Sequence, residues 1–170
     1  MDLPQTLIST LIEAKNILVL TGAGMSAESG VPTFRDAQTG LWENLRPEDL
    51  ATPQAFERQP QLVWDWYCER RANIRTVTPH AGHYALVEME AYFSDLRVIT
   101  QNVDSLHQQS GSNEVIELHG NIMCSICNRT GKYIDEAWIK ANPGHPPGSP
   151  HHPQGLARPG VVWFGEALPD

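Results

Sequence analysis

The chain has 170 residues with 41% hydrophobic and 19% charged positions, values that suit one globular domain, with or without a small insert. Its formal net charge of −8 argues against a nucleic-acid-binding face and suits a basic partner such as a lysine-containing peptide. The chain shows no apolar run long enough to span a bilayer and no basic leader with a cleavage site. Its three cysteines cannot form a closed disulfide set. We therefore expect a cytoplasmic protein that binds neither membrane nor nucleic acid.

The first half of the chain predicts a helix, a strand and then mostly helical structure. Leu7 and Leu11 recur at helical spacing, and the apolar run Ile17–Leu20 follows as a short buried strand. Residues 36–60 are polar and punctuated by Pro and Gly, which favours short helices and a mobile loop over sheet. A longer helix is expected over Gln61–Ile74.

The middle of the chain predicts a parallel sheet. A helix over Ala81–Tyr92 leads to an apolar strand at Leu96–Thr100, and a third short strand is expected at Val115–Leu118. Strands joined by helical spacers of this length indicate an α/β protein with a Rossmann-like, doubly wound parallel sheet.

The composition changes after His119. Residues 142–159 are dense in Pro, Gly and His, which indicates a small insert with little core of its own. The apolar run Val161–Phe164 then predicts a further strand.

A glycine turn follows the first strand directly. Gly22, Ala23 and Gly24 precede a predicted helix start, where backbone amides can face a phosphate group. The strict dinucleotide fingerprint is not met because Ala27 stands at its last glycine position, a replacement that the fingerprint tolerates. Alone, this pattern suits a turn without a nucleotide equally well.

Three ordered segments carry a family resemblance: GAGMSAESGVPTFR at 22–35, TQNVDSLHQQSG at 100–111 and ELHGN at 117–121. Together with CSIC at 124–127 and VVWFGEALP at 161–169, they closely resemble the sirtuin family of NAD-dependent protein-lysine deacylases, especially its bacterial class III members. The resemblance implies that the Rossmann-like NAD-binding domain comprises residues 1–35, 77–122 and 160–170. It also implies a cofactor-binding loop and helical segment over 36–76, and a small zinc-ribbon-like module over 123–159.

The same resemblance implies an NAD site and an activity. Its expected cofactor-binding residues are Gly22, Ala23, Gly24, Ala27, Phe34, Arg35, Gln101, Asn102 and Asp104. The expected catalytic residues are His119 as base, with Asn102 and Asp104 holding the nicotinamide carboxamide and the ribose. An imidazole, with an ordinary pKa of about 6.5, can take a proton from a ribose hydroxyl at neutral pH. The expected products are free lysine, nicotinamide and acyl-ADP-ribose.

Several of these residues also have a purely structural explanation. Asp104 can cap the following helix, and it can do so while facing a ligand. His107, on that helix, is expected to be structural, and Phe34 considered alone would be a core residue.

Substrate preference has a separate signal in the segment WDWYCERR. Tyr67 and Arg70 are three residues apart, hence on one face of a helix. This pair resembles the one in sirtuins that remove succinyl, malonyl or glutaryl groups. An arginine fork and a phenol hydroxyl can both bind the carboxylate of such a group. The alternative is a solvated arginine beside a core tyrosine. Acetyl-lysine proteins or peptides are expected as additional substrates.

The metal site departs from the family pattern. Cys124 and Cys127 supply one Cys-x-x-Cys pair. The resemblance implies a second pair of zinc ligands shortly before Gly155, and that segment contains no cysteine. His151 and His152 lie there, and His145 is a further candidate, so a Cys₂His₂ zinc site is chemically possible. The alternative is a metal-free module.

The end of the chain is the second departure. The family continues beyond VVWFGEALP, so we expect a C-terminally truncated form that lacks part of the sheet and of the adenosine site. Two other functions stay open: a non-catalytic NAD or ADP-ribose-binding module, and an NAD hydrolase or mono-ADP-ribosyltransferase that uses the same site.

Overall fold

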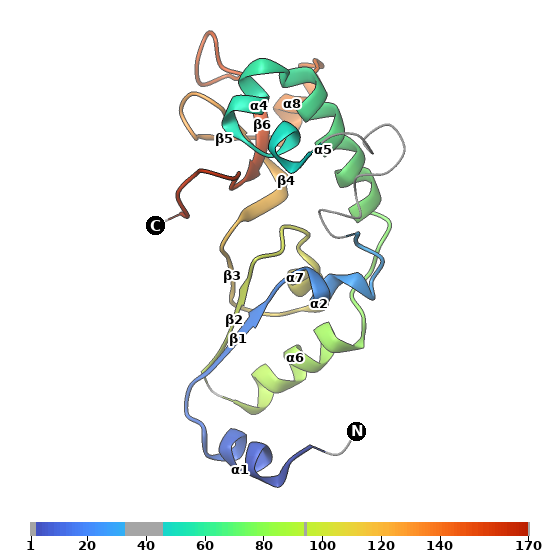
Figure 1. Cartoon of the computed structure of the whole chain (residues 1–170), viewed down its shortest axis with the longest axis vertical. Helices are drawn as coiled ribbons and strands as arrows, with labels where there is room; N and C mark the ends of the chain where they lie inside the picture. Colours follow the sequence, from blue (N-terminus) through green and yellow to red (C-terminus); the bar gives the residue numbers. More distant parts are fainter. Residues whose placement is uncertain (1–2, 33–45, 94, 170) are drawn as a thin grey trace.

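Two sheets lie one above the other along the long axis of the molecule (Figure 1). The computed structural model describes residues 3–32, 46–93 and 95–169. The N-terminal helix α1 (Gln5–Glu13) lies at one end, and α8 (Glu136–Ala141) lies near the other. Within the described residues, no helix is both long and apolar enough to cross a membrane.

The first sheet is parallel, with strand order β1-β2-β3. Its strands are β1 (Ile17–Thr21), β2 (Leu96–Thr100) and β3 (Val115–Glu117). Val98 at the centre of β2 is fully buried and lies opposite Val19 and Val115. All three predicted strands are present, and the Rossmann-like parallel sheet is confirmed.

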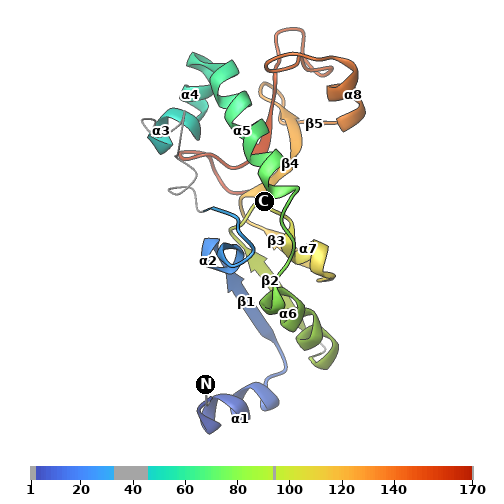
Figure 2. The same cartoon turned by 90° about the vertical axis from the view of Figure 1, so that its right-hand side faces the viewer.

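Helices lie against one face of this sheet. They are α2 (Ala23–Ala27), α6 (Ala81–Tyr92) and α7 (Leu106–Ser110), which Figure 2 shows beside the strands. Alternate residues of a strand face opposite sides, and the other face carries Leu18 and Leu20, which are 64% and 63% exposed. The predicted first helix also forms, but α1 buries none of its residues.

The second sheet is antiparallel, with strand order β5-β4-β6. It consists of β4 (Gly120–Cys127), β5 (Tyr133–Ile134) and β6 (Ala157–Val161). The predicted strand at Val161–Phe164 is wrong, because Val161 is the last residue of β6. Beyond it the backbone N–H groups bond elsewhere: Val162 donates to the His119 carbonyl and Phe164 to the Ala51 carbonyl.

Three helices pack against the second sheet and bury most of the core. They are α3 (Pro47–Leu50), α4 (Pro53–Arg58) and α5 (Pro60–Ile74). Phe56, Val63 and Trp66 pack in one cluster with Ile122 of β4 and Trp163. The expected short helices and the longer helix that follows them are therefore confirmed.

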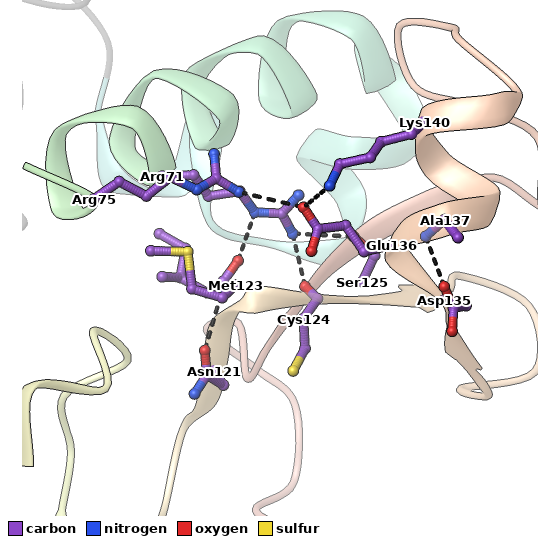
Figure 3. A network of polar contacts seen from close by, with 11 residues as sticks. Arg71, Arg75, Asn121, Met123, Cys124, Ser125, Asp135, Glu136, Ala137 and Lys140 are labelled. Atoms are coloured by element: carbon purple, nitrogen blue, oxygen red, sulfur yellow. Dashed lines mark hydrogen bonds and ion pairs between the residues drawn. The ribbon is translucent and has the colours of Figure 1, made fainter. Parts of the chain in front are cut away.

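Arg71 joins α5 to β4. Its guanidinium donates to the carbonyl oxygens of Ile122 and Cys124 at 2.5 and 2.6 Å and to Ser125 Oγ at 3.1 Å (Figure 3). The side chain is buried and lies over the Trp64 ring. Arg71 therefore has a structural role, and it orients the helix that carries its neighbour Arg70.

Gly120 is required where β4 passes β6. Its φ is +70°, and a Cβ added there would collide with the Gly160 carbonyl oxygen. Gly131 has nearly the same φ, +68°, but a Cβ there would meet nothing within 4 Å. The two glycines therefore separate the cost of the backbone conformation from the cost of the collision.

We expect Gly120→Ala to lower the free energy of unfolding by about 3 kcal/mol and Gly131→Ala by about 1 kcal/mol. The left-handed backbone destabilises both variants, whereas the collision affects only the first. Urea denaturation of the two variants and the parent protein measures the difference. Equal losses at both positions would show that the strands separate at no cost.

Candidate functional site

A cavity of about 410 Å³ opens beyond the carboxyl ends of the parallel strands, between the two sheets. This is where open α/β sheets bind their ligands, and the volume is within the range of small-molecule sites. The predicted site residues that line the cavity are Ala23, Tyr67, Arg70, Gln101, Asn102, Asp104 and His119. They come from four separate segments of the sequence.

The His119 imidazole is oriented by the backbone. It follows β3, is half-buried, and its Nδ1 lies 3.0 Å from the Gln101 carbonyl oxygen. A carbonyl oxygen only accepts, so Nδ1 carries the proton and donates it. In the neutral ring Nε2 is then the unprotonated nitrogen, which is the state that a general base requires.

Asn102 ties the end of β2 to the glycine turn. Its Nδ2 donates to the Gly22 carbonyl oxygen and to Ser26 Oγ, each at 2.9 Å. Both amide protons are therefore used to hold the turn, and its Oδ1 is the atom left for a ligand. The residue positions the cavity wall as well as lining it.

Asp104 holds the start of α7 and also belongs to the cavity lining. It is 4% exposed, and its Oδ1 accepts a hydrogen bond from the Leu106 N–H at 3.0 Å, at the start of α7. Its carboxylate also lines the cavity. Ser105 between them has a φ of +65°, so the chain turns sharply at this point.

Tyr67 and Arg70 both line the cavity from α5, as their spacing predicts. Tyr67 is 4% exposed, and burial raises the pKa of its phenol to about 12, so it keeps its proton. Burial lowers the pKa of the Arg70 guanidinium, while the charge of Asp104 acts to raise it. An arginine remains charged despite such a shift, and this one also lies 4.9 Å from the centre of the Trp66 ring.

Residues 22–170 match the model of the Sir2 family. The chain belongs to this family. The resemblance to sirtuins is thereby confirmed over most of the sequence.

Named relatives of this sirtuin are protein deacylases. The "NAD-dependent protein deacylase" of Aquifex aeolicus (strain VF5) is 52% identical over 158 residues, covering 93% of this chain and 65% of the relative. The protein of that name from Leptospira interrogans serogroup Icterohaemorrhagiae serovar copenhageni is 50% identical over 156 residues, covering 92% of this chain and 63% of the relative. The chain therefore spans less than two thirds of the length of these relatives.

A solved structure shows the same fold. A Sir2 homologue in complex with NAD superposes with a TM-score of 0.85 at 42% identity, and the match covers 99% of this chain and 64% of that chain.

Other predicted residues of the sirtuin site lie outside the cavity lining or outside the described chain. Gly22, Gly24 and Ala27 belong to the turn and to α2 but do not line the cavity. From this turn, Ala23 and Ser26 line it. The roles predicted for Phe34 and Arg35 fall on residues outside the described part of the chain.

Sequence reasoning missed two hydrogen-bonding side chains of the site. Ser26 is 2% exposed and accepts the Asn102 hydrogen bond inside the cavity wall. Trp163 is 3% exposed and its indole N–H donates to the Tyr67 hydroxyl. A hydroxyl inside the glycine-turn motif was an available signal for Ser26, whereas no local pattern indicated Trp163, because its partner is far away in the sequence.

The two predicted cysteine ligands have different surroundings. Both lie on β4, three positions apart, and the pairing of β4 with β6 is irregular between Asn121 and Ser125. Cys127 is 1% exposed, whereas Cys124 is half-buried, with its thiol directed away from Arg71 (Figure 3). Burial acts to raise the pKa of the Cys127 thiol, but hydrogen bonds from Ser149 and Thr130 lower it to about 7.

The three histidines considered as further ligands also have protein partners. Within the described parts of the chain, no three His, Cys, Asp or Glu side chains come close enough to hold a metal ion together. The residues present therefore do not fit a structural zinc. The histidine contacts are His145 Nδ1 with Asp65 Oδ1 at 2.7 Å, His151 Nε2 with the Tyr133 carbonyl at 2.7 Å, and His152 Nδ1 with the Gln154 N–H at 3.1 Å.

A buried group of histidines lies behind the cavity wall. The ring centres of His80 and His83 are 4.4 Å apart, and those of His83 and His107 are 5.0 Å apart. His80 Nε2 contacts the Met25 carbonyl of α2 at 2.6 Å, and His107 Nε2 contacts Thr21 Oγ1 at 3.0 Å. The group thus links α6 and α7 to the glycine turn, which is the structural role expected for His107.

Acidification should destabilise the protein through these histidines. Burial, followed by the neighbouring His107 and His80, lowers the pKa of His83 to about 4, and burial also lowers the pKa of His107. The unfolded chain, with an ordinary pKa of about 6.5, therefore binds protons first as the pH falls. The stability from a neutral His83 is complete above about pH 6.5 and is lost as the pH falls from there toward about 4.

We expect His83 to cost about 2 kcal/mol of unfolding free energy between about pH 6.5 and pH 5. Urea denaturation across this range measures the slope. In His83→Asn an amide oxygen replaces Nδ1, which accepts from the His80 N–H, and the side chain no longer titrates. The variant should be less stable at pH 7 but show a shallower slope. An unchanged slope would exclude His83 as its source.

Proposed function

We propose that this chain carries the reacting side of an NAD-dependent protein-lysine deacylase. The observation that carries the proposal is the oriented His119 imidazole in one cavity with Gln101, Asn102 and Asp104. The named relatives and the NAD complex of a Sir2 homologue support it. The acyl group would leave lysine for ADP-ribose, with nicotinamide released.

The cavity offers NAD suitable partners. Asn102 Oδ1 and the buried Asp104 carboxylate can accept hydrogen bonds from hydroxyl or amide groups, and Ala23 and Ser26 bring the glycine turn to the cavity edge. When bound, NAD supplies the ADP-ribose that accepts the acyl group. His119 Nε2 would take a proton from a ribose hydroxyl, while its Nδ1–H, fixed on the Gln101 carbonyl, keeps the ring from rotating.

The preferred acyl group would be acidic. Arg70 and Tyr67 place a cation and a neutral phenol in the same cavity as His119. A succinyl or malonyl carboxylate can pair with the guanidinium fork and accept from the phenol. Acetyl groups would also be removed, since a smaller uncharged group fits the same space. A Sir2 protein bound to an acetylated peptide, 29% identical with a TM-score of 0.80, supports acyl-lysine peptides as partners.

The cytoplasm is the proposed location. All three cysteines, Cys68, Cys124 and Cys127, are free thiols, as is usual in a reducing compartment.

Mass spectrometry of a succinyl-lysine peptide incubated with the protein and NAD tests the proposal. Free lysine together with succinyl-ADP-ribose is the expected result. Nicotinamide release without deacylation would select an NAD hydrolase or, with an ADP-ribosylated acceptor, a mono-ADP-ribosyltransferase. Binding of NAD or ADP-ribose without any turnover would select a non-catalytic binding module.

A further inference from the structure

The Tyr67 hydroxyl has a fixed hydrogen-bond donor that the sequence did not reveal. Trp163 Nε1 lies 2.9 Å from Tyr67 Oη, and both side chains are almost fully buried. An indole N–H can only donate, so the phenol oxygen is the acceptor. Within the described chain, this is the one hydrogen bond found for the Tyr67 hydroxyl. The phenol proton is therefore available for donation to a ligand.

Trp163 is itself held on several sides. The Arg158 guanidinium carbon lies 3.4 Å from the centre of its ring, and the Phe56 ring centre lies at 5.4 Å. Arg158 donates to both carboxylate oxygens of Glu166 at 2.6 and 2.9 Å, and Glu166 accepts the Trp163 backbone N–H at 2.8 Å. These contacts hold the indole on several sides, with its N–H directed at the phenol.

We propose that Trp163 is a positioning residue for acyl specificity: by occupying the Tyr67 oxygen with its indole N–H, it directs the phenol proton toward an acyl carboxylate bound by Arg70. The inference rests on the proposed deacylase function. Tyr67, Arg70 and Trp163 all line the same cavity, so the phenol proton and the guanidinium can reach one ligand. An uncharged acetyl group gains nothing from this arrangement, so the effect is one of selectivity.

A double-mutant cycle tests the coupling. The kcat/KM values for succinyl-lysine and acetyl-lysine peptides are measured for the parent, Trp163→Phe, Tyr67→Phe and the double variant. Trp163→Phe keeps an aromatic ring and removes the donor, and it should lower the succinyl-to-acetyl ratio by about fivefold. In the Tyr67→Phe background the same change should leave the ratio unaltered. A merely structural role would lower both activities alike, and that outcome overturns the inference.

A measurement without turnover guards against loss of folding or activity. The indole ¹H–¹⁵N signal of Trp163, assigned by its absence in Trp163→Phe, should shift in Tyr67→Phe and again when a succinyl-lysine peptide binds. If the signal shifts neither in Tyr67→Phe nor on peptide binding, the inference is contradicted. Glu166→Gln retains the indole but weakens the clamp on Arg158, and it should lower the same ratio by a smaller factor.

The outcomes separate the two proposals. A parent protein that prefers succinyl-lysine while Trp163→Phe leaves that preference intact refutes the positioning role alone. A parent protein that neither binds nor deacylates either peptide refutes the deacylase function and the positioning role with it.

Discussion

His119→Asn is expected to lower kcat for deacylation by about a hundredfold or more, the usual contribution of a positioned general base. The asparagine amide can take the place of Nδ1 and donate to the Gln101 carbonyl, so the local backbone contact survives. No atom then occupies the position of Nε2. The variant therefore removes the proton acceptor while keeping the anchor that orients it.

Steady-state kinetics with an acyl-lysine peptide and NAD measures this loss, and NAD binding by calorimetry shows that the cavity persists. His151→Gln is the matched control, since His151 is exposed and its Nε2 contacts the Tyr133 carbonyl, a bond that a glutamine amide can replace. The control should retain the parental kcat. A loss smaller than tenfold in His119→Asn would exclude His119 as the base.

The parallel sheet could be predicted from the sequence because its signals are local. Each strand is a short apolar run, and the helix before β2 was placed at its observed residues, Ala81–Tyr92. The last strand could not be placed in this way. Apolar residues 161–164 look like a strand, but Val162 and Phe164 bond to His119 and Ala51, partners that no local pattern specifies.

The site shows the same division. His119 and Asn102 could be placed from their motifs, but the second duty of Asn102, holding Gly22 and Ser26, needs the fold. Trp163 was hidden because its partner Tyr67 lies 96 residues earlier in the chain. The cysteine pair left both a zinc site and a metal-free module open, because the spacing alone does not show that both residues lie on the extended strand β4.

Arg70→Met is expected to lower desuccinylation by about thirtyfold and deacetylation by less than about threefold. A hydrogen bond from a charged donor to a carboxylate typically contributes 1.5–3 kcal/mol, and a methionine of similar length keeps the apolar packing against Trp66. The acetyl group carries no carboxylate, so it loses little. A lysine at this position should restore only part of the preference, because it lacks the planar fork.

Arg75→Met, at the C-terminal end of the same helix, is the matched control for the same change in chemistry. Arg75 follows the last residue of α5, is exposed, and its nearest carboxylate, Glu136, is 4.0 Å away on α8. It is not among the residues that line the cavity within the described chain. Comparing kcat/KM for the two peptides in both variants isolates the role of Arg70. An equal loss of both activities in Arg70→Met would contradict acyl recognition and leave a structural role.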